Sequence, residues 1–197
     1  MPTLVRVSFP DLITSREAEA RLAYPGLARR QARRVLAAGL AGPAMATRSA
    51  VLYQAEAVND LTCWPVLTEA EVDVACPSGV FVARRDLDLM SPRAEVVQAL
   101  REGWDLSPYT SAWIRAVCQQ DGCLPFVATV GGFVALGAEI TGVAQTADRQ
   151  RRLDLRDAGE WFEMFRGARF PTGPGRDWVL RGSPCSSVSR SVGESPP

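Results

Sequence analysis

The sequence predicts an α+β protein in two parts, with short helices and a small hairpin first and a mixed α+β region with a small antiparallel sheet after it. Gly and Pro turns separate helix start and stop signals up to about residue 65. Beyond that point, apolar β-prone runs flank Gly131-Gly132, which is a hairpin signal. The 197 residues are 47% hydrophobic, which is enough for one or two packed cores.

We expect a first domain over residues 1–65, an α+β domain over residues 66–182 and a flexible tail over residues 183–197. The tail holds six Ser and three Pro and has little to bury. In the first domain, Thr14 or Ser15 can cap a helix, and Gly39 is a typical residue after a helix end. The expected elements here are helices over residues 16–22, 28–38 and 55–61, a stop at residues 24–26, and a hairpin of residues 45–48 with 50–53.

Serine precedes proline at Ser91-Pro92 and Ser107-Pro108, a pattern typical of helix starts. In the second domain we therefore expect helices over residues 92–102 and 108–120, a capped turn or short helix at 68–71, and a helix capped by Asp157 through 161–165. Expected strands are residues 79–83, 124–130, 133–136 and 177–181, with 139–143 as a further candidate and 172–176 as a turn. Four tryptophans should build the core, with a ligand pocket as the alternative: Trp104, Trp113, Trp161 and Trp178.

Composition excludes several kinds of chemistry. The chain has no histidine and no lysine, so imidazole bases, Schiff-base lysines and phosphate-loop lysines are absent. Arginine in place of lysine also fits coding in a GC-rich genome. We therefore predict a protein that is not an enzyme and needs no cofactor. Without a membrane-spanning run or a signal segment, it should be cytoplasmic.

Cysteine and carboxylate spacings suggest metal sites only weakly. Cys118-x4-Cys123, with Cys63 and Cys76 upstream, has the thiols for zinc or iron–sulfur binding but an unusual spacing. Buried structural cysteines are the preferred interpretation, and no metal is predicted. Carboxylates at three-residue spacing are interpreted as an ion-paired solvated face: Asp154, Asp157, Glu160 and Glu163.

Charge is unevenly distributed although the formal net charge is zero. Residues 1–65 carry eight Arg against five acids, and residues 66–146 carry five Arg against ten acids. Within the first domain, the second expected helix has Leu27, Ala32, Val35 and Leu36 on one face and Arg29, Arg30, Arg33 and Arg34 on the other. Such a basic helix face either meets a polyanion or is simply solvated.

The order helix, turn, arginine-faced helix, hairpin and helix is that of a winged helix-turn-helix. Residues 10–64 resemble the DNA-binding domain shared by MerR-type regulators and excisionase (AlpA)-like proteins. The matching segments are residues 12–19 for the opening helix, 26–36 for the arginine helix, Gly39-Leu40 for its exit, Arg48 with 51–53 for the wing, and 56–61 for the closing helix. The chain departs from the pattern in a longer turn over residues 22–28 and in lacking the long MerR dimerisation helix.

The resemblance implies a recognition helix in the major groove of double-stranded DNA. Arg29 and Arg30 are then best placed for base edges, with Gln31 as a second candidate, while Arg33 and Arg34 contact phosphate. Arg48, at the wing tip, would enter the minor groove or grip the backbone. A solvated surface charge is the alternative for each arginine.

We therefore expect sequence-specific binding of double-stranded DNA, in a transcriptional regulator. Residues 66–182 would provide a homodimer contact, a protein partner site or an effector site, with no membrane partner. One alternative is a phage or mobile-element factor, such as an excisionase or a packaging recognition subunit. Another is a protein-interaction or antitoxin-like module in which DNA contact is secondary.

Overall fold

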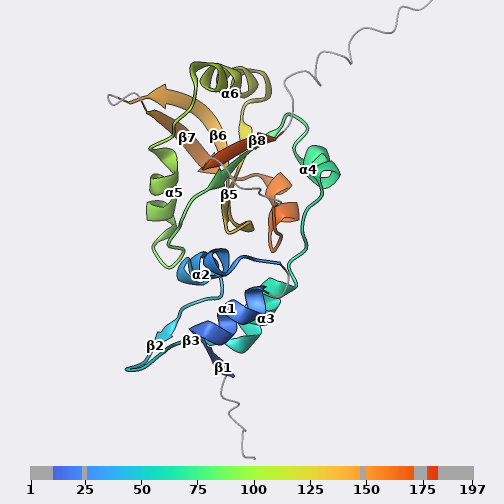
Figure 1. Ribbon diagram of the computed structural model, residues 1–197. Coiled ribbons are helices and arrows are strands. Elements are labelled where there is room, and N and C mark those ends of the chain that lie inside the picture. The colour runs from blue at the N-terminus through green and yellow to red at the C-terminus, as the bar shows by residue number, and fades with distance from the viewer. Residues whose placement is uncertain (1–10, 24–25, 147–149, 171–176, 182–197) are drawn as a thin grey trace, which may run out of the picture.

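The computed structural model is a mixed α+β fold with two sheets (Figure 1). It describes residues 11–23, 26–146, 150–170 and 177–181. The expected stop at residues 24–26, the turn at 172–176, the tail at 183–197 and Cys185 lie wholly or partly outside these residues. None of the helices in the described ranges combines the length and apolar character needed to cross a membrane.

The N-terminal part is built from three helices and a three-stranded antiparallel sheet. Its elements are β1 (Leu12–Thr14), α1 (Ser15–Ala23), α2 (Arg29–Ala37), β2 (Met45–Ala46), β3 (Val51–Gln54) and α3 (Ala55–Thr62). The strand order is β1-β3-β2, and Ile13 pairs with Tyr53 while Ala46 pairs with Val51. The three expected helices and the hairpin are confirmed, whereas β1 was not expected.

Local signals account for the ends of these helices. The Thr14 N–H donates to Glu17 Oε2 (2.8 Å) and the Glu17 N–H donates to Thr14 Oγ1 (3.3 Å), a reciprocal cap at the start of α1. Beyond the end of α2, Gly39 has a φ of +82°, which favours glycine. A Cβ at Gly39 would also lie 2.7 Å from Met90 Sδ, so the Met90 side chain packs directly against the backbone at this position.

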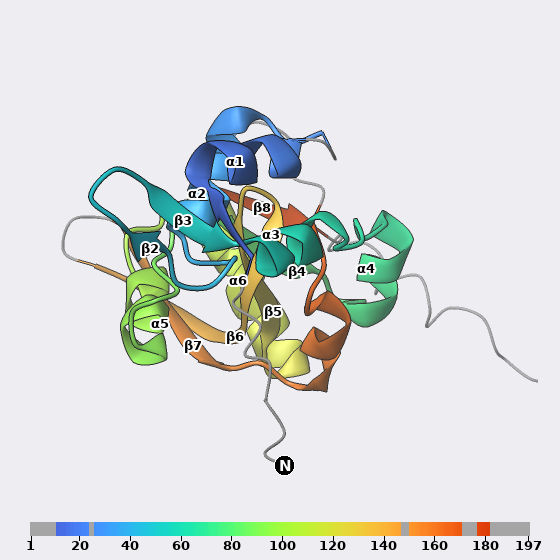
Figure 2. The same ribbon diagram turned by 90° about the horizontal axis from the view of Figure 1, so that it is seen from below.

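The second part is a five-stranded sheet with helices on both faces. Its elements are α4 (Glu69–Ala75), β4 (Val80–Arg84), α5 (Arg93–Arg101), α6 (Pro108–Asp121), β5 (Leu124–Val130), β6 (Phe133–Gln145), β7 (Arg151–Asp157), a 3-10 helix (Glu160–Phe165) and β8 (Trp178–Arg181). The strand order is β7-β6-β5-β4-β8, with β4 and β5 parallel and the other neighbours antiparallel. In Figures 1 and 2, α4 lies on the side opposite α5.

Several expectations about the second part are corrected. A small antiparallel sheet was expected, but the sheet has five strands and is mixed, because β4 and β5 run parallel. The two runs expected separately at residues 133–136 and 139–143 form one long strand, β6. Residues 151–157, for which no strand was expected, form β7, and the helix after it is capped by Gly159 rather than Asp157. The carboxylate series from Asp154 to Glu163 therefore spans a strand and a 3-10 helix. Three of its four acids are in exposed ion pairs, in line with the interpretation as an ion-paired solvated face: Asp154, Asp157 and Glu163.

The sheet separates two apolar clusters. One face packs rings around Phe81, which stacks on Phe126 and Trp178 and meets Trp104 edge-on. The other face packs Phe162 and Phe165 against the sheet. Trp104 is fully buried, as expected for a core residue, while Trp113, Trp161 and Trp178 are half-buried at the borders of the clusters.

The first cluster continues without a break from the sheet into the N-terminal part, and α2 forms the junction. The β5–β6 turn lies against this helix: a Cβ added to Gly131 would be 2.8 Å from Val35 Cγ2 and 3.3 Å from the Gln31 carbonyl oxygen. The Leu89 N–H also donates to the Ala38 carbonyl (2.9 Å). The second part thus fixes the position of α2.

This junction predicts a specific coupling between two residues. Gly131→Ala should lower the free energy of unfolding by about 1–3 kcal/mol through overpacking against Val35, beyond the strain of its positive φ. In a Val35→Ala background the added methyl finds space, so the cost should shrink. Urea unfolding of the four variants in a double-mutant cycle measures the coupling. Gly122→Ala, whose Cβ would meet nothing within 4 Å, is the additive control; equal coupling for both glycines would contradict the packing.

Candidate nucleic-acid interface

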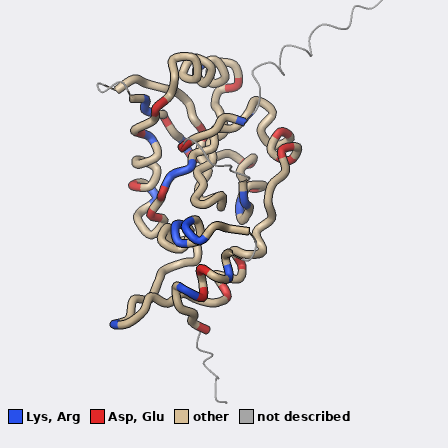
Figure 3. The backbone as a smooth tube through the Cα atoms, in the orientation of Figure 1, with Lys and Arg blue, Asp and Glu red and all other residues tan. Residues whose placement is uncertain are grey.

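Helix α2 presents an arginine stripe opposite its buried face. Ala32, Val35 and Leu36 are buried, whereas four arginines cover the remaining arc: Arg29, Arg30, Arg33 and Arg34. Figure 3 shows these basic positions gathered on α2 beside the second part, with another basic position at the tip of the β2–β3 hairpin. The sequence-predicted amphipathic pattern of this helix is therefore present in the fold.

A buried carboxylate organises two of the arginines. The Nε–H of Arg29 donates to Glu19 Oε2 and the Nε–H of Arg33 donates to Glu19 Oε1, both at 2.7 Å. Glu19 comes from α1, and only 10% of its side chain is exposed, whereas the arginine side chains are 66% and 61% exposed. One acid on the first helix thus holds two arginines one turn apart on the second.

The charge of Glu19 is stabilised by this arrangement. Hydrogen bonds from Arg33 and Arg29 lower the pKa of the Glu19 carboxyl below its ordinary value, against the opposing effect of burial. Burial raises the pKa of Tyr53 on β3, and the nearby Glu19 charge adds to that effect. Glu19 is therefore ionised near neutral pH. It lies where α1, α2 and β3 meet.

Arg34 is paired with an acid from the second part of the chain. Its Nε–H donates to Asp86 Oδ1, in the segment that follows β4. The Asp86 side chain is 74% exposed, so this pair is open to solvent, unlike the Glu19 pair. An exposed pair of this kind contributes about 0–1 kcal/mol and can exchange for another anion.

Gln31 has a local structural role. Its Oε1 accepts a hydrogen bond from the Ala28 N–H (3.2 Å), which caps the start of α2. The residue is half-buried, with its carbonyl and Cβ close to Gly131. Gln31, the second candidate for base contact, thus lies at the junction rather than in the arginine stripe.

Arg30 and Arg48 are exposed and contact no acid among the described residues. Arg48 lies in the turn between β2 and β3. The hydroxyl of Thr47 shapes this turn, because it donates to the Ala50 carbonyl (2.8 Å) and accepts from the Ala50 N–H (3.0 Å). The two arginines are thus unneutralised positive charges on α2 and on the hairpin.

Glu19 and Asp86 were not among the site residues predicted from the sequence. A signal for Glu19 existed, because it lies between Ala18 and Leu22, which are fully buried in the same helix. A carboxylate beside such apolar positions needs a cationic partner. No comparable signal marks Asp86, which is 52 positions away from Arg34 and exposed.

Buried structural cysteines were expected, but among the described cysteines only Cys76 is buried; Cys118 and Cys123 are half-buried and Cys63 is exposed. The Cys118 thiol donates to the Ile140 carbonyl (3.2 Å), and burial raises the pKa of Cys76 to about 12. Glu139 accepts from Arg156 Nε (2.6 Å), Trp161 Nε1 (2.9 Å) and the Gly159 N–H (3.0 Å). Across the described ranges, no three or more Cys, Asp or Glu side chains are grouped so that they could hold a metal ion.

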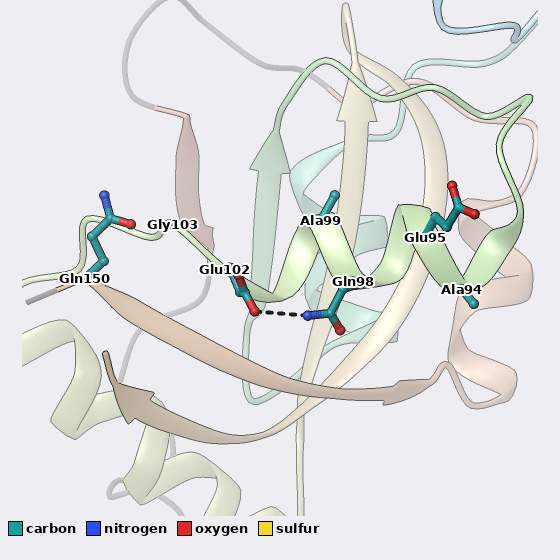
Figure 4. A pocket seen from close by; sticks show the side chains of 7 residues that line it. All are labelled: Ala94, Glu95, Gln98, Ala99, Glu102, Gly103 and Gln150. Atoms are coloured by element: carbon teal, nitrogen blue, oxygen red, sulfur yellow. Dashed lines mark hydrogen bonds between the residues drawn. The ribbon is translucent and has the colours of Figure 1, made fainter. Parts of the chain in front are cut away.

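Two hollows open on the second part. One, of about 710 Å³, runs along α5 and is drawn in Figure 4, where Gln98 donates to Glu102 at 2.9 Å. Its other lining residues are Ala94, Glu95, Ala99, Gly103 and Gln150. The second, of about 420 Å³, lies where β4 ends and β8 begins, beside Trp104 and Trp178. Both offer carboxylates and hydrogen-bonding groups, and neither lining set contains a cysteine.

A comparison of the chain with protein-family models, curated proteins and solved structures found no match. The functional argument therefore rests on the geometry of α2, the hairpin and the acids that pair with them.

The ion pairs of Glu19 with Arg29 and Arg33 predict a pH-dependent contribution to stability. Folding lowers the pKa of Glu19. The ionised Glu19 therefore adds to the free energy of unfolding at pH values above the ordinary glutamate pKa, about 4.3. This contribution is lost as the pH falls through the pKa of Glu19 in the folded state. Glu19→Gln should lower the urea midpoint at neutral pH, and its difference from the parent should shrink toward pH 3. Glu56→Gln, an exposed acid on α3, should stay close to the parent. A difference for Glu19→Gln that is constant with pH would contradict the assignment.

Proposed function

We propose that the protein is a non-enzymatic, sequence-specific binder of double-stranded DNA, with α2 as its recognition helix and the β2–β3 hairpin as a wing. The observation that carries the proposal is the arginine stripe on the face of α2 that the first apolar cluster leaves open. The lack of histidine and lysine supports binding rather than catalysis.

The dimensions of the elements suit a duplex. An α-helix with its side chains is about 10–12 Å in diameter, which fits the major groove, about 12 Å wide. The order of strand, two helices, hairpin and helix is that of winged helix-turn-helix domains, in which the second helix enters the groove. The hairpin carries Arg48 in its turn, where a wing would meet the DNA backbone or minor groove.

Charge supports the same target. Arg30 and Arg48 can approach phosphates without losing an ion pair within the described residues, and Arg34 can exchange the exposed Asp86 for phosphate. Each phosphate neutralised releases counterions from the duplex, which is the main source of non-specific affinity. Glu19 offsets part of the charge of α2 and so limits purely electrostatic binding.

The second part has the role of a scaffold for α2 in this proposal. It holds the helix through Gly131, Leu89 and Met90, and residues 66–182 are also the proposed site of self-association, a protein partner or an effector. The proposed DNA contact is compatible with a transcriptional regulator and equally with a phage or mobile-element factor.

A second candidate function is a protein-interaction module. It is favoured by the pairing of three of the four arginines of α2 with acids of the same chain, which reduces the need for an external polyanion. Selection of bound sequences from a random duplex library by the full-length protein separates the candidates. An enriched motif supports the DNA proposal, and no enrichment at low salt overturns it.

The two arginines without acidic partners predict a salt dependence. Arg30→Ala and Arg48→Ala should each weaken binding to selected and unselected duplexes alike. Each should flatten the slope of log K against log salt by about 0.9 for every phosphate that the arginine neutralises. Fluorescence anisotropy over a salt series measures this. Arg152→Ala, on β7, removes the same charge away from α2 and should leave the slope unchanged; an equal change of slope in the control would contradict the interface.

The Arg34–Asp86 pair predicts a gain in affinity. Asp86→Asn removes a competing anion beside α2, so duplex binding should tighten about two- to fivefold at low salt and less as salt screens the charge. Asp73→Asn, an exposed acid on α4, changes the net charge equally and should have a smaller effect. Identical gains from both variants would show that only net charge matters.

A further inference from the structure

We infer that Glu19 fixes Arg29 and Arg33 as a paired guanine-reading unit, so that the target duplex carries guanines about two base-pair steps apart. The inference rests on the proposed function and deepens it, because it names the feature of the DNA that α2 would recognise.

The Glu19 side chain is constrained by its surroundings. Its carboxylate lies between Ala18 and Leu22, both fully buried, and nine-tenths of its side chain is covered. Each of its two oxygens accepts one Nε–H at 2.7 Å. A carboxylate held in this way cannot turn toward the solvent, so it sets the direction of both guanidinium groups.

Arg29 and Arg33 keep further hydrogen-bond donors beside the Nε–H that each gives to Glu19. A guanidinium has five N–H donors in a rigid plane, and the Nε–H is only one of them. The Nε of each arginine is bound to Glu19, and the side-chain hydrogen bonds that Arg29 and Arg33 make within the described residues involve Nε alone. Because the two side chains are 66% and 61% exposed, their Nη groups can donate to a ligand. Two parallel N–H groups of this kind match guanine O6 and N7 in the major groove.

The spacing of the two arginines can be compared with the spacing of bases in a duplex. Arg29 and Arg33 are four residues apart, which is about 6 Å along a helix axis. Successive bases are about 3.4 Å apart along a duplex. The two guanidinium groups therefore span about two base-pair steps when both enter the groove. Their shared bond to Glu19 requires them to approach it together.

Arg30 and Arg34 differ from this pair. Arg30 has no acidic partner within the described residues, and Arg34 is paired only with the exposed Asp86. Neither is oriented by a buried group, so both are suited to phosphate, which tolerates varied approach. The structure thus assigns base reading to Arg29 with Arg33, whereas the sequence had placed Arg30 beside Arg29.

The experiment compares Glu19→Gln with the parent on two duplexes of equal length and base composition, one selected from the library and one scrambled. An amide has one acceptor and one donor group in place of two acceptor oxygens, so it can hold only one Nε–H. It also removes a negative charge. We expect the affinity for the scrambled duplex to stay equal or rise, while the ratio of the two affinities falls at least fivefold. Glu56→Gln is the control with the same charge change and should keep the ratio.

Other outcomes overturn the inference. If Glu19 only repels DNA, Glu19→Gln tightens binding to both duplexes equally. If Glu19 only stabilises the fold, affinity for both duplexes falls together with the thermal midpoint. If the parent protein binds no duplex, the proposed function fails and the inference fails with it. If the parent and the Glu19→Gln variant both prefer the selected duplex to the same extent, the inference is refuted while the proposed function stands.

A second set of variants leaves Glu19 untouched. Arg29→Lys and Arg33→Lys keep the charge but lose the planar fork, so they should keep the salt slope and lose discrimination. In the selected duplex, 7-deazaguanine removes the N7 acceptor while keeping the base pair. The substitution should weaken the parent protein and have little further effect on the lysine variants. Equal weakening of parent and lysine variants by 7-deazaguanine overturns the inference.

Discussion

The packing of α2 against both parts of the chain is the constraint on which the rest of the structure depends. A helix of nine residues is too short to be stable alone in water. Contacts with α1 on one side, and with Gly131 and Leu89 on the other, supply that stability. Because these contacts cover the face with Ala32, Val35 and Leu36, the opposite arc stays exposed, and arginine predominates on it. The same packing that makes the helix possible thus leaves its basic face outward.

The ion pairs on this arc follow from its charge. Four arginines within six residues repel one another unless acids lie beside them. Glu19 meets this need from a buried position, where each of its oxygens accepts one arginine Nε–H at 2.7 Å. Asp86 meets it from an exposed position, where the pair is weak and replaceable. The two acids therefore differ in consequence: one restricts where side chains point, and the other competes with external anions.

Local features of the fold could be predicted from the sequence, and long-range ones could not. The cap at Thr14, the Ser107-Pro108 start of α6 and the Gly131-Gly132 turn depend on neighbouring residues, and each was predicted. By contrast, β1 has three residues and pairs with a strand about 40 positions later, so no local pattern reveals it. Strand β7 was missed because its charged residues outnumber the buried Leu153 and Leu155. The arginines of the candidate site could be found from periodicity, but the acids that orient them come from other elements.

The fixed position of α2 also bears on how two molecules would act together. If residues 66–182 associate in pairs, the junction at Gly131 transmits the symmetry of that contact directly to the two copies of α2. The distance between the helices would then be set by the second part and not by a flexible linker. Dimeric helix-turn-helix proteins place their helices one helical turn of DNA apart, about 34–36 Å, so half-site spacing reports this distance. A selected DNA motif with two half-sites at one fixed spacing would thus reveal both the partner surface and the rigidity of the junction.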